Sequence, residues 1–184
     1  MWRRFRFRRR RRLKVAHLAA LITLAVVMGL LSRGGWLYNL RQRWTDPFPP
    51  KISGLARLID GDSLWVGIYE VRLKGIDAPE GNQICLRKGV AWNCGEAARG
   101  ALSRMIGWKT VTCDVSERDI YNRLLANCRA GNRDLNAAMV EAGMAVAYGG
   151  YWQEERIAKA GHRGVWDSEF QMPRQWRDEH KQPR

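Results

Sequence analysis

Residues 58–80 constrain the fold most, because they combine two short apolar runs with several acids and an arginine. The runs at 64–66 and 71–73 flank a Gly67-Ile68 pair, and this pattern predicts a β-hairpin. Before the first run lies Asp60-Gly61, which favours a tight turn or bulge because glycine accepts positive φ. The segment therefore predicts two antiparallel strands with a turn at each end.

Four side chains of this segment are candidates for chemistry. Asp62 follows the turn, Arg72 lies in the second strand, and Asp77 and Glu80 are expected on a loop beyond it. Strand ends and loops are where a rigid scaffold presents functional groups. The alternative is that the acids cap or solvate turns, and that Arg72 pairs with Glu70 at a strand surface.

Several separated motifs of this chain resemble, in the right order, those of the staphylococcal-nuclease-like (thermonuclease) family. The hairpin segment reads Ile-Asp-Gly-Asp-Ser, then Val-Arg-Leu, then Ile-Asp-Ala-Pro-Glu. Residues 118–123 resemble the family's Asp-x-Tyr-Gly-Arg motif, and residues 136–148 resemble its helix and following tyrosine. The ending, with Gly-Val-Trp at 164–166 and Pro173 before Trp-Arg at 176–177, is similar to a cysteine-containing, membrane-anchored bacterial branch. The resemblance covers residues 53–177.

The remaining periodicity predicts an α+β chain. Helical spacing is present at residues 94–106, 134–142 and, more weakly, 152–162, and strand character at 109–115 and 124–129. The family resemblance sharpens this class to an OB-fold-like five-stranded β-barrel with about three helices.

The acids predict a metal site. Asp62 and Asp77 have no His or Cys near them in the sequence, and such a hard oxygen site suits Ca²⁺ or Mg²⁺ better than zinc. In the family, the matching aspartates bind Ca²⁺ together with the main-chain carbonyl at the position of Ala78. The resemblance therefore favours Ca²⁺ over Mg²⁺.

The other site residues follow from the resemblance. Arg72 and Arg123 match the family's phosphate-binding arginines, whose planar guanidinium groups donate two parallel hydrogen bonds. Glu80 matches the residue to which the role of general base is commonly assigned. Tyr121 and Tyr148 match positions that contact the nucleotide, although Tyr148 could equally be a core residue.

Three departures from the family pattern affect the substrate prediction. Asn122 replaces a glycine, and asparagine tolerates positive φ, so the loop should survive. Ile120 replaces a basic residue and removes a phosphate contact. The segment between Cys85 and Cys94 replaces a basic, flexible loop, so the family's substrate preference cannot be carried over.

Most of the net charge of +14 lies in the first 50 residues, which carry twelve basic side chains and one acid. Residues 51–184 carry 20 basic and 17 acidic side chains and are nearly balanced, which gives little electrostatic support for polyanion binding. The arginine-rich start precedes an apolar run at 15–31, which predicts a signal-anchor or transmembrane helix within residues 1–35. A cleaved signal peptide or a nucleic-acid-binding arm are the alternatives.

The predicted organisation has four parts. A proline-containing linker at 36–52 follows the membrane segment, the nuclease-like domain occupies 53–177, and a tail occupies 178–184. The expected location is the bacterial inner membrane, crossed once, with the N-terminus in the cytoplasm and the domain in the periplasm. The protein would be secreted if the signal is cleaved.

The four cysteines all lie in the domain expected to be exported, where disulfides form more readily than in the cytoplasm. Four cysteines allow three pairings. Cys113 and Cys128 lie at two strand ends that flank a loop, which favours their pairing and leaves Cys85 with Cys94. Four free thiols are the alternative.

The function predicted from these features is a Ca²⁺-dependent, membrane-tethered nuclease. It would act on single-stranded or unstructured DNA and RNA as a monomer, and would leave 3′-phosphates. The alternative is a catalytically silent OB-fold module that binds nucleic acid or a partner. No histidine lies near the acids, which makes a histidine-based hydrolase improbable.

Overall fold

The computed structural model describes residues 21–24, 26–29 and 48–180. The chain divides into two compact units, with the boundary between Pro47 and Phe48. Among the described residues, no helix has the length and apolar character needed to cross a membrane. The predicted anchor and linker lie mostly outside the described residues.

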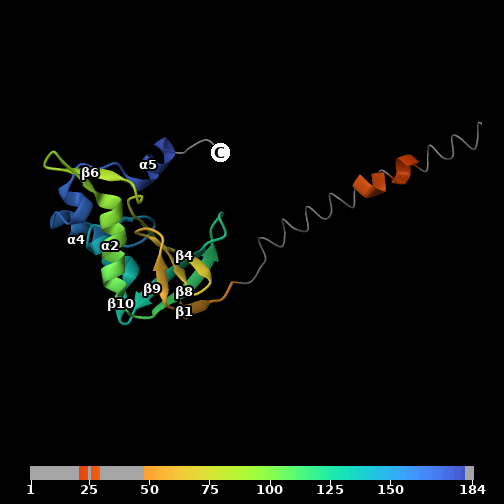
Figure 1. Ribbon diagram of the computed structural model, residues 1–184, viewed down its shortest axis with the longest axis horizontal. Helices are drawn as coiled ribbons and strands as arrows, with labels where there is room; N and C mark the ends of the chain where they lie inside the picture. The colour runs from red at the N-terminus through yellow and green to blue at the C-terminus, as the bar shows by residue number, and fades with distance from the viewer. Residues whose placement is uncertain (1–20, 25, 30–47, 181–184) are drawn as a thin grey trace, which may run out of the picture. The chain divides into compact units, whose positions relative to one another are not determined.

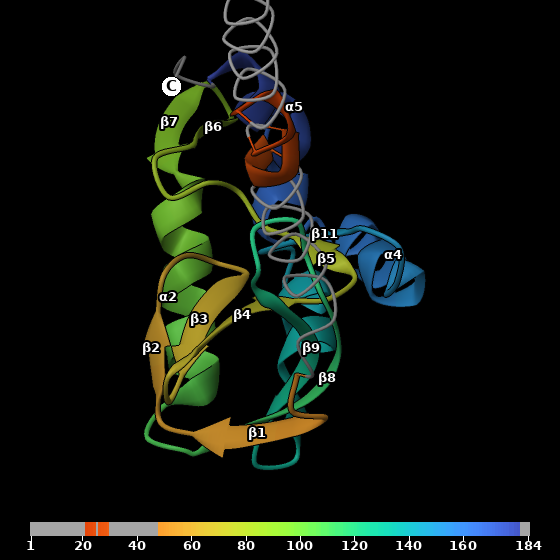
Figure 2. The same ribbon diagram turned by 90° about the vertical axis from the view of Figure 1, so that its right-hand side faces the viewer.

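A strongly curled sheet forms the centre of the second unit (Figure 2). Its strands pair in the order β1-β8-β9-β4-β3-β2, with β10 added on β9, and β4 and β9 alone among these pairs are parallel. The strands are β1 (Lys51–Gly54), β2 (Ala56–Leu58), β3 (Ser63–Val66), β4 (Tyr69–Leu73), β8 (Val111–Arg118), β9 (Leu124–Ala130) and β10 (Arg133–Asp134). Because only Leu55 separates β1 from β2, the two ends of the pairing order are joined by the chain itself. The mixed α+β class is confirmed, and the curled sheet is consistent with an OB-like fold, but this sheet has seven strands where five were predicted.

Two helices cover the sheet where the sequence predicted them. Helix α2 (Cys94–Ile106) begins at an Asn93 cap and buries Ala98, Ala101 and Leu102, among others. Helix α3 (Leu135–Glu141) begins at an Asp134 cap and buries Leu135, Met139 and Val140. Their apolar faces meet the inward side chains of β3, β4 and β9 in one core.

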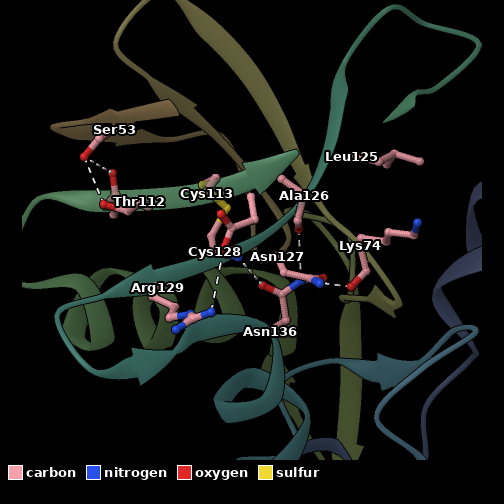
Figure 3. The surroundings of a disulfide bond; sticks show 12 residues. Ser53, Lys74, Thr112, Cys113, Leu125, Ala126, Asn127, Cys128, Arg129 and Asn136 are labelled. Atoms are coloured by element: carbon pink, nitrogen blue, oxygen red, sulfur yellow. Dashed lines mark hydrogen bonds and ion pairs between the residues drawn. A yellow bond between two sulfur atoms is a disulfide. The ribbon is translucent and has the colours of Figure 1, made fainter. Parts of the chain in front are cut away.

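The Cys113–Cys128 disulfide joins β8 to β9 at directly opposed positions, as predicted. Figure 3 shows Asn136 of α3 beside it. The fully buried Asn136 side chain accepts a hydrogen bond from the Cys128 backbone N–H and donates to the Lys74 carbonyl at 2.9 Å. This amide holds α3 against β9 and against the end of β4.

The Cys85–Cys94 disulfide, also as predicted, closes a second hairpin of β6 (Ile84–Arg87) and β7 (Val90–Asn93). This regular hairpin stands where the sequence suggested only the replacement of a flexible loop. Its disulfide packs against Val165, Trp166 and Phe170 in a second, smaller core.

The C-terminal part adds α4 (Trp152–Ala160), the short 3₁₀ helix η1 (Gly164–Asp167) and α5 (Pro173–Glu179). Helix α4 confirms the third predicted helix, two residues shorter at its end. The prediction of about three helices was too low, because residues 48–180 contain four α-helices. The prediction missed α5, since Pro173 at its first position is a start signal without an apolar period of its own. In both views α5 lies near the β6–β7 hairpin (Figures 1 and 2).

Gly61 has a different role from the one predicted. It does not have a positive φ. A Cβ atom at this position would instead lie 2.8 Å from the Cβ atoms of both Ala78 and Ala98, closer than real contacts allow. Glycine is needed here because the turn before Asp62 packs directly against α2 and against the acid-containing loop.

Candidate active site

Asp62 is held beside Arg72 by the register of the first hairpin. Ser63 of β3 lies opposite Arg72 of β4, and the Leu73 backbone N–H donates to the carbonyl of Asp62, the residue just before β3, at 2.8 Å. Arg72 Nη1 donates to Asp62 Oδ1 at 3.0 Å, and the Ala78 backbone N–H donates to Asp62 Oδ2 at 2.9 Å. The Ser63 hydroxyl adds a third hydrogen bond, to Oδ1. Asp62 is buried, at 2% exposure, and both of its carboxylate oxygens accept hydrogen bonds.

Burial raises the pKa of Asp62 to about 7. Arg72 and the Ala78 hydrogen bond act in the opposite direction, and the neighbouring charges of Asp60 and Asp77 add to the increase. Burial therefore disfavours the charged form of Asp62 in the metal-free chain, and a cation bound beside it would favour that form.

Asp77 lies on a short strand, whereas the prediction placed it on a loop. It ends β5 (Ile76–Asp77), which pairs with β11 (Val146–Ala147). Arg72 Nη2 donates to Asp77 Oδ1 at 2.7 Å, so one guanidinium joins Asp77 to Asp62. The alternative pairing of Arg72 with Glu70 is not what the structure shows. Sequence alone gave no strand signal here, because a two-residue strand exists only through its tertiary partner.

Glu80 lies on the loop after β5, as predicted, and Gln83 fixes that loop. The Gln83 backbone N–H donates to the Glu80 carbonyl at 2.8 Å, and the Glu80 N–H donates back to Gln83 Oε1 at 3.2 Å. Helix α2 also presses against the loop, because a Cβ atom on Gly95 would overlap the Glu80 carbonyl oxygen. The Glu80 carboxylate is therefore attached to a backbone segment with little conformational freedom.

Arg123 is presented by a loop that Asp119 organises. Asp119 Oδ1 accepts hydrogen bonds from the backbone N–H groups of Tyr121 and Arg123, and its Oδ2 accepts from Arg123 Nε at 2.7 Å. Asn122 has φ 71°, so the loop survives the replacement of glycine as predicted. The ion pair is made through Nε, and the guanidinium also lies over the Tyr121 ring.

One pocket of about 700 Å³ collects most of the predicted residues. Tyr121 and Tyr148 are 65% and 56% exposed, which answers the question about Tyr148 in favour of a surface position. The pocket is lined by Asp60, Glu70, Arg72, Asp77, Glu80, Ile120, Tyr121, Arg123, Tyr148, Arg174, Arg177 and Asp178. Asp62 and Ala78 lie behind this surface, bonded to each other.

Arg177 of α5 was not predicted as a site residue. Its guanidinium donates to both oxygens of Asp77 and to Glu80 Oε1. The sequence offered one signal, a basic residue in the Trp176-Arg177 pair of the C-terminal motif. A separation of 97 residues from Glu80 gave no reason to place the two together.

The donors at the site fit a hard divalent cation. Asp62, Asp77, Glu80 and the Ala78 carbonyl offer oxygen alone, the ligand type that Ca²⁺ and Mg²⁺ prefer. In the part of the chain that the structure describes, no three His, Cys, Asp or Glu side chains are grouped so as to hold a metal ion. Guanidinium groups of Arg72 and Arg177 lie among these carboxylates. The oxygen donors are of the type that Ca²⁺ prefers, but guanidinium groups already bond them, and the predicted metal ligands stay a prediction.

Comparison with known proteins now identifies the family. The sequence model of the family described as "Staphylococcal nuclease homologue" matches residues 70–168, more than half of the chain. The chain belongs to the staphylococcal nuclease family. The matched region of this family member contains Arg72, Asp77, Glu80 and Arg123, whereas Asp62 and Arg177 lie outside it.

Three known proteins are similar to this chain. The succinoglycan biosynthesis protein ExoI of Rhizobium meliloti is 34% identical over 123 residues, which are 62% of this chain and 64% of that protein. The probable staphylococcal-like nuclease CAN1 of Oryza sativa is 30% identical over 124 residues, 64% of this chain and 35% of that protein. A Haemophilus influenzae protein named "Uncharacterized endonuclease" is 31% identical over 139 residues, 69% of this chain and 73% of that protein. This staphylococcal nuclease homologue thus spans less than two thirds of the first two.

Proposed function

We propose that this chain is a Ca²⁺-dependent nuclease that hydrolyses phosphodiester bonds of DNA and RNA and leaves 3′-phosphates. One observation carries the proposal. Arg72, Asp77, Glu80 and Arg123, from three separate parts of the chain, line one pocket, and Asp62 is bonded to Arg72 behind it. Family membership supports nuclease activity in general, and the donor chemistry supports the metal.

The residues divide the reaction among them. Arg72 and Arg123 bind the phosphate oxygens, on which negative charge grows in the transition state. Glu80 takes a proton from the attacking water as the water oxygen bonds to phosphorus. The bond from phosphorus to the 5′-oxygen breaks, and that oxygen takes up a proton from solvent and leaves as a hydroxyl. When bound by Asp62, Asp77 and the Ala78 carbonyl, Ca²⁺ supplies positive charge that stabilises the same phosphate.

The exposed tyrosines favour single-stranded or unstructured substrate. Rings such as those of Tyr121 and Tyr148, at the edge of a phosphate-binding pocket, stack on bases that are not paired. We propose that a monomer is active, because all of these groups come from one chain.

We also propose that the domain works outside the cytoplasm, tethered by its N-terminal segment. The arginine-rich start followed by an apolar run supports the tether, and the two disulfides support an oxidising compartment. Cell fractionation with a protease-accessibility assay tests this. Domain recovered from the cytoplasm, shielded from protease until the cells are lysed, would contradict it.

The activity test uses the full chain in a mild detergent, with single-stranded DNA and RNA oligonucleotides. Hydrolysis is expected in Ca²⁺ and is expected to be lost in chelator, with 3′-phosphate ends identified by mass spectrometry. Asp77→Asn should remove activity, whereas Asp114→Asn, which changes an exposed surface ion pair on β8, should not. Oligonucleotide that stays bound and intact for hours in Ca²⁺ would instead indicate a silent binding module. Activity that is unchanged by chelation would exclude the metal.

A further inference from the structure

Helix α5 places Arg177 on two acids of the pocket. Its Nη1 donates to Asp77 Oδ1 and to Glu80 Oε1, each at 2.8 Å, and its Nη2 donates to Asp77 Oδ2 at 3.0 Å. Burial acts to lower the pKa of this guanidinium, but the hydrogen bonds to Asp77 and Glu80 outweigh it, and the pKa is raised. Arg177 therefore makes the strong, charge-assisted fork that arginine forms with carboxylates.

The segment that carries α5 is anchored on the disulfide hairpin. Leu86 of β6 exchanges two backbone hydrogen bonds with Glu169, at 2.9 and 2.8 Å. The fully buried Gln83 side chain, whose oxygen holds the Glu80 N–H, donates from Nε2 to the Gln171 carbonyl. One glutamine thus links the loop of Glu80 to the start of α5. Arg177 is delivered by a fixed scaffold and not by a loose tail.

Arg177 uses the same oxygens that a divalent cation would need. Asp77 Oδ1 also accepts a hydrogen bond from Arg72, so guanidinium groups bond both oxygens of this carboxylate. A metal ion at Asp77 would bring a second positive charge against Arg177 at short range, where like charges repel. Either the guanidinium moves away or the metal binds more weakly.

We propose that Arg177 is a tethered counter-cation of Asp77 and Glu80, which neutralises this pair in the metal-free chain and competes with Ca²⁺ for it. This inference rests on the Ca²⁺-dependent function proposed above. Metal binding moves Arg177 off Glu80 and leaves that carboxylate able to accept a proton from water. The displaced guanidinium stays at the pocket on α5, where a substrate phosphate can bind it. Ca²⁺ and substrate therefore favour each other's binding.

The test measures Ca²⁺ binding to the full chain in mild detergent by isothermal titration calorimetry, without substrate. Arg177→Gln removes the charge and should tighten Ca²⁺ binding roughly tenfold, the order expected for loss of one competing partly exposed ion pair. Its melting temperature without metal should fall, because Glu80 then loses its ion pair with Arg177 and Asp77 keeps only Arg72. Arg177→Lys keeps a positive charge and should stay within about twofold of wild type.

The matched control is Arg174→Gln, which loses the same charge one turn earlier on α5, where Arg174 lies 3.5 Å from the Tyr148 hydroxyl. It should change Ca²⁺ affinity far less than Arg177→Gln. Circular dichroism checks that the variants fold. If Arg177→Gln does not fold, a truncated chain that ends at residue 172, and therefore lacks α5, replaces it. That chain should show the same tightening.

Each outcome decides the proposal. The proposal is supported if Arg177→Gln binds Ca²⁺ more tightly than Arg174→Gln does. This holds even if the wild-type chain binds Ca²⁺ too weakly to measure. If wild type binds Ca²⁺ measurably and Arg177→Gln leaves that affinity unchanged or lowers it, the counter-cation role of Arg177 is wrong. The proposed nuclease function is not affected by that result. Absence of Ca²⁺ binding in wild type and all variants overturns both.

Discussion

Arg72 and Asp77 are joined by a 2.7 Å hydrogen bond from Nη2 to Oδ1, while Nη1 of the same guanidinium reaches Asp62. The bond ties β4 to β5 and ties the two predicted metal ligands to each other. Burial acts to lower the pKa of Arg72, but the charges of Asp62 and Asp77 outweigh it and raise the pKa. Arg72 thus belongs to the fold as much as to the site, and its substitution should affect both.

For Arg72→Lys we expect a loss of about a hundredfold in turnover, since the fork that binds phosphate is replaced by a single ammonium. Stability should also fall, by on the order of 2 kcal/mol, because one charge-assisted hydrogen bond to a buried carboxylate is lost. Kinetics and denaturant unfolding measure the two effects. The control is Arg129→Lys in an exposed ion pair 3.7 Å from Asp114, which should change neither. Full activity in Arg72→Lys would contradict its role at the phosphate.

Arg123→Lys should lower turnover with little loss of stability, unlike Arg72→Lys. Its partner Asp119 also accepts hydrogen bonds from the backbone N–H groups of Tyr121 and Arg123, which this change leaves in place. We therefore expect a stability loss of only about 1 kcal/mol and again about a hundredfold loss of turnover. The free energy of unfolding and the rate, measured on one preparation, test this. A large loss of stability with normal turnover would assign Arg123 to the loop alone.

Glu80→Gln keeps the size of the side chain but removes the base. Turnover should fall by about 10² to 10⁴-fold, the range for loss of a general base. The fold should hold, because the loop is fixed by backbone bonds to Gln83. Glu117→Gln, which changes an exposed pair with Lys74, is the matched control. The assignment fails if Glu80→Gln turns substrate over at the wild-type rate.

The raised pKa of Asp62 predicts a pH dependence of stability in the metal-free chain. Between pH 3.8, the ordinary pKa of an aspartate, and about pH 7, Asp62 is ionised in the unfolded chain and largely protonated in the folded chain, so the folded chain holds more protons. The free energy of unfolding should therefore fall as pH rises through this window and level off above it. Asp62→Asn removes the titrating group, and the fall should be smaller in that variant. Denaturant unfolding at several pH values, wild type against variant, measures the difference, and equal slopes would contradict the raised pKa.

The two disulfides should differ in what they support. Replacing Cys85 and Cys94 by alanine opens a separation of 9 residues, and replacing Cys113 and Cys128 opens one of 15, so each should lower stability by about 3 kcal/mol. Only the first pair holds the hairpin that anchors α5. At a temperature where both variants are folded, activity should fall in the first and persist in the second. Equal activities of the two variants would mean that the β6–β7 hairpin does not support the active site.

Much of this protein follows from its sequence, because the signals are local. The β3–β4 hairpin, α2, α3 and α4 have apolar periods and start or stop residues within their own span. The disulfide pairing could be predicted because Cys113 and Cys128 lie in neighbouring strands joined by a short loop. Arg72, Glu80 and Arg123 were recognised because their motifs are short and contiguous.

Tertiary structure decided the remainder, and in each case the partner is distant along the chain. Asp77 lies on a strand only because β11 pairs with it, and Gly61 is required only because Ala78 and Ala98 approach it. Arg177 reaches Asp77 across 100 residues of chain, through hydrogen bonds that β6 and Gln83 make to the segment before α5. Local sequence encodes propensity and spacing, whereas contacts between distant segments depend on how the whole core packs.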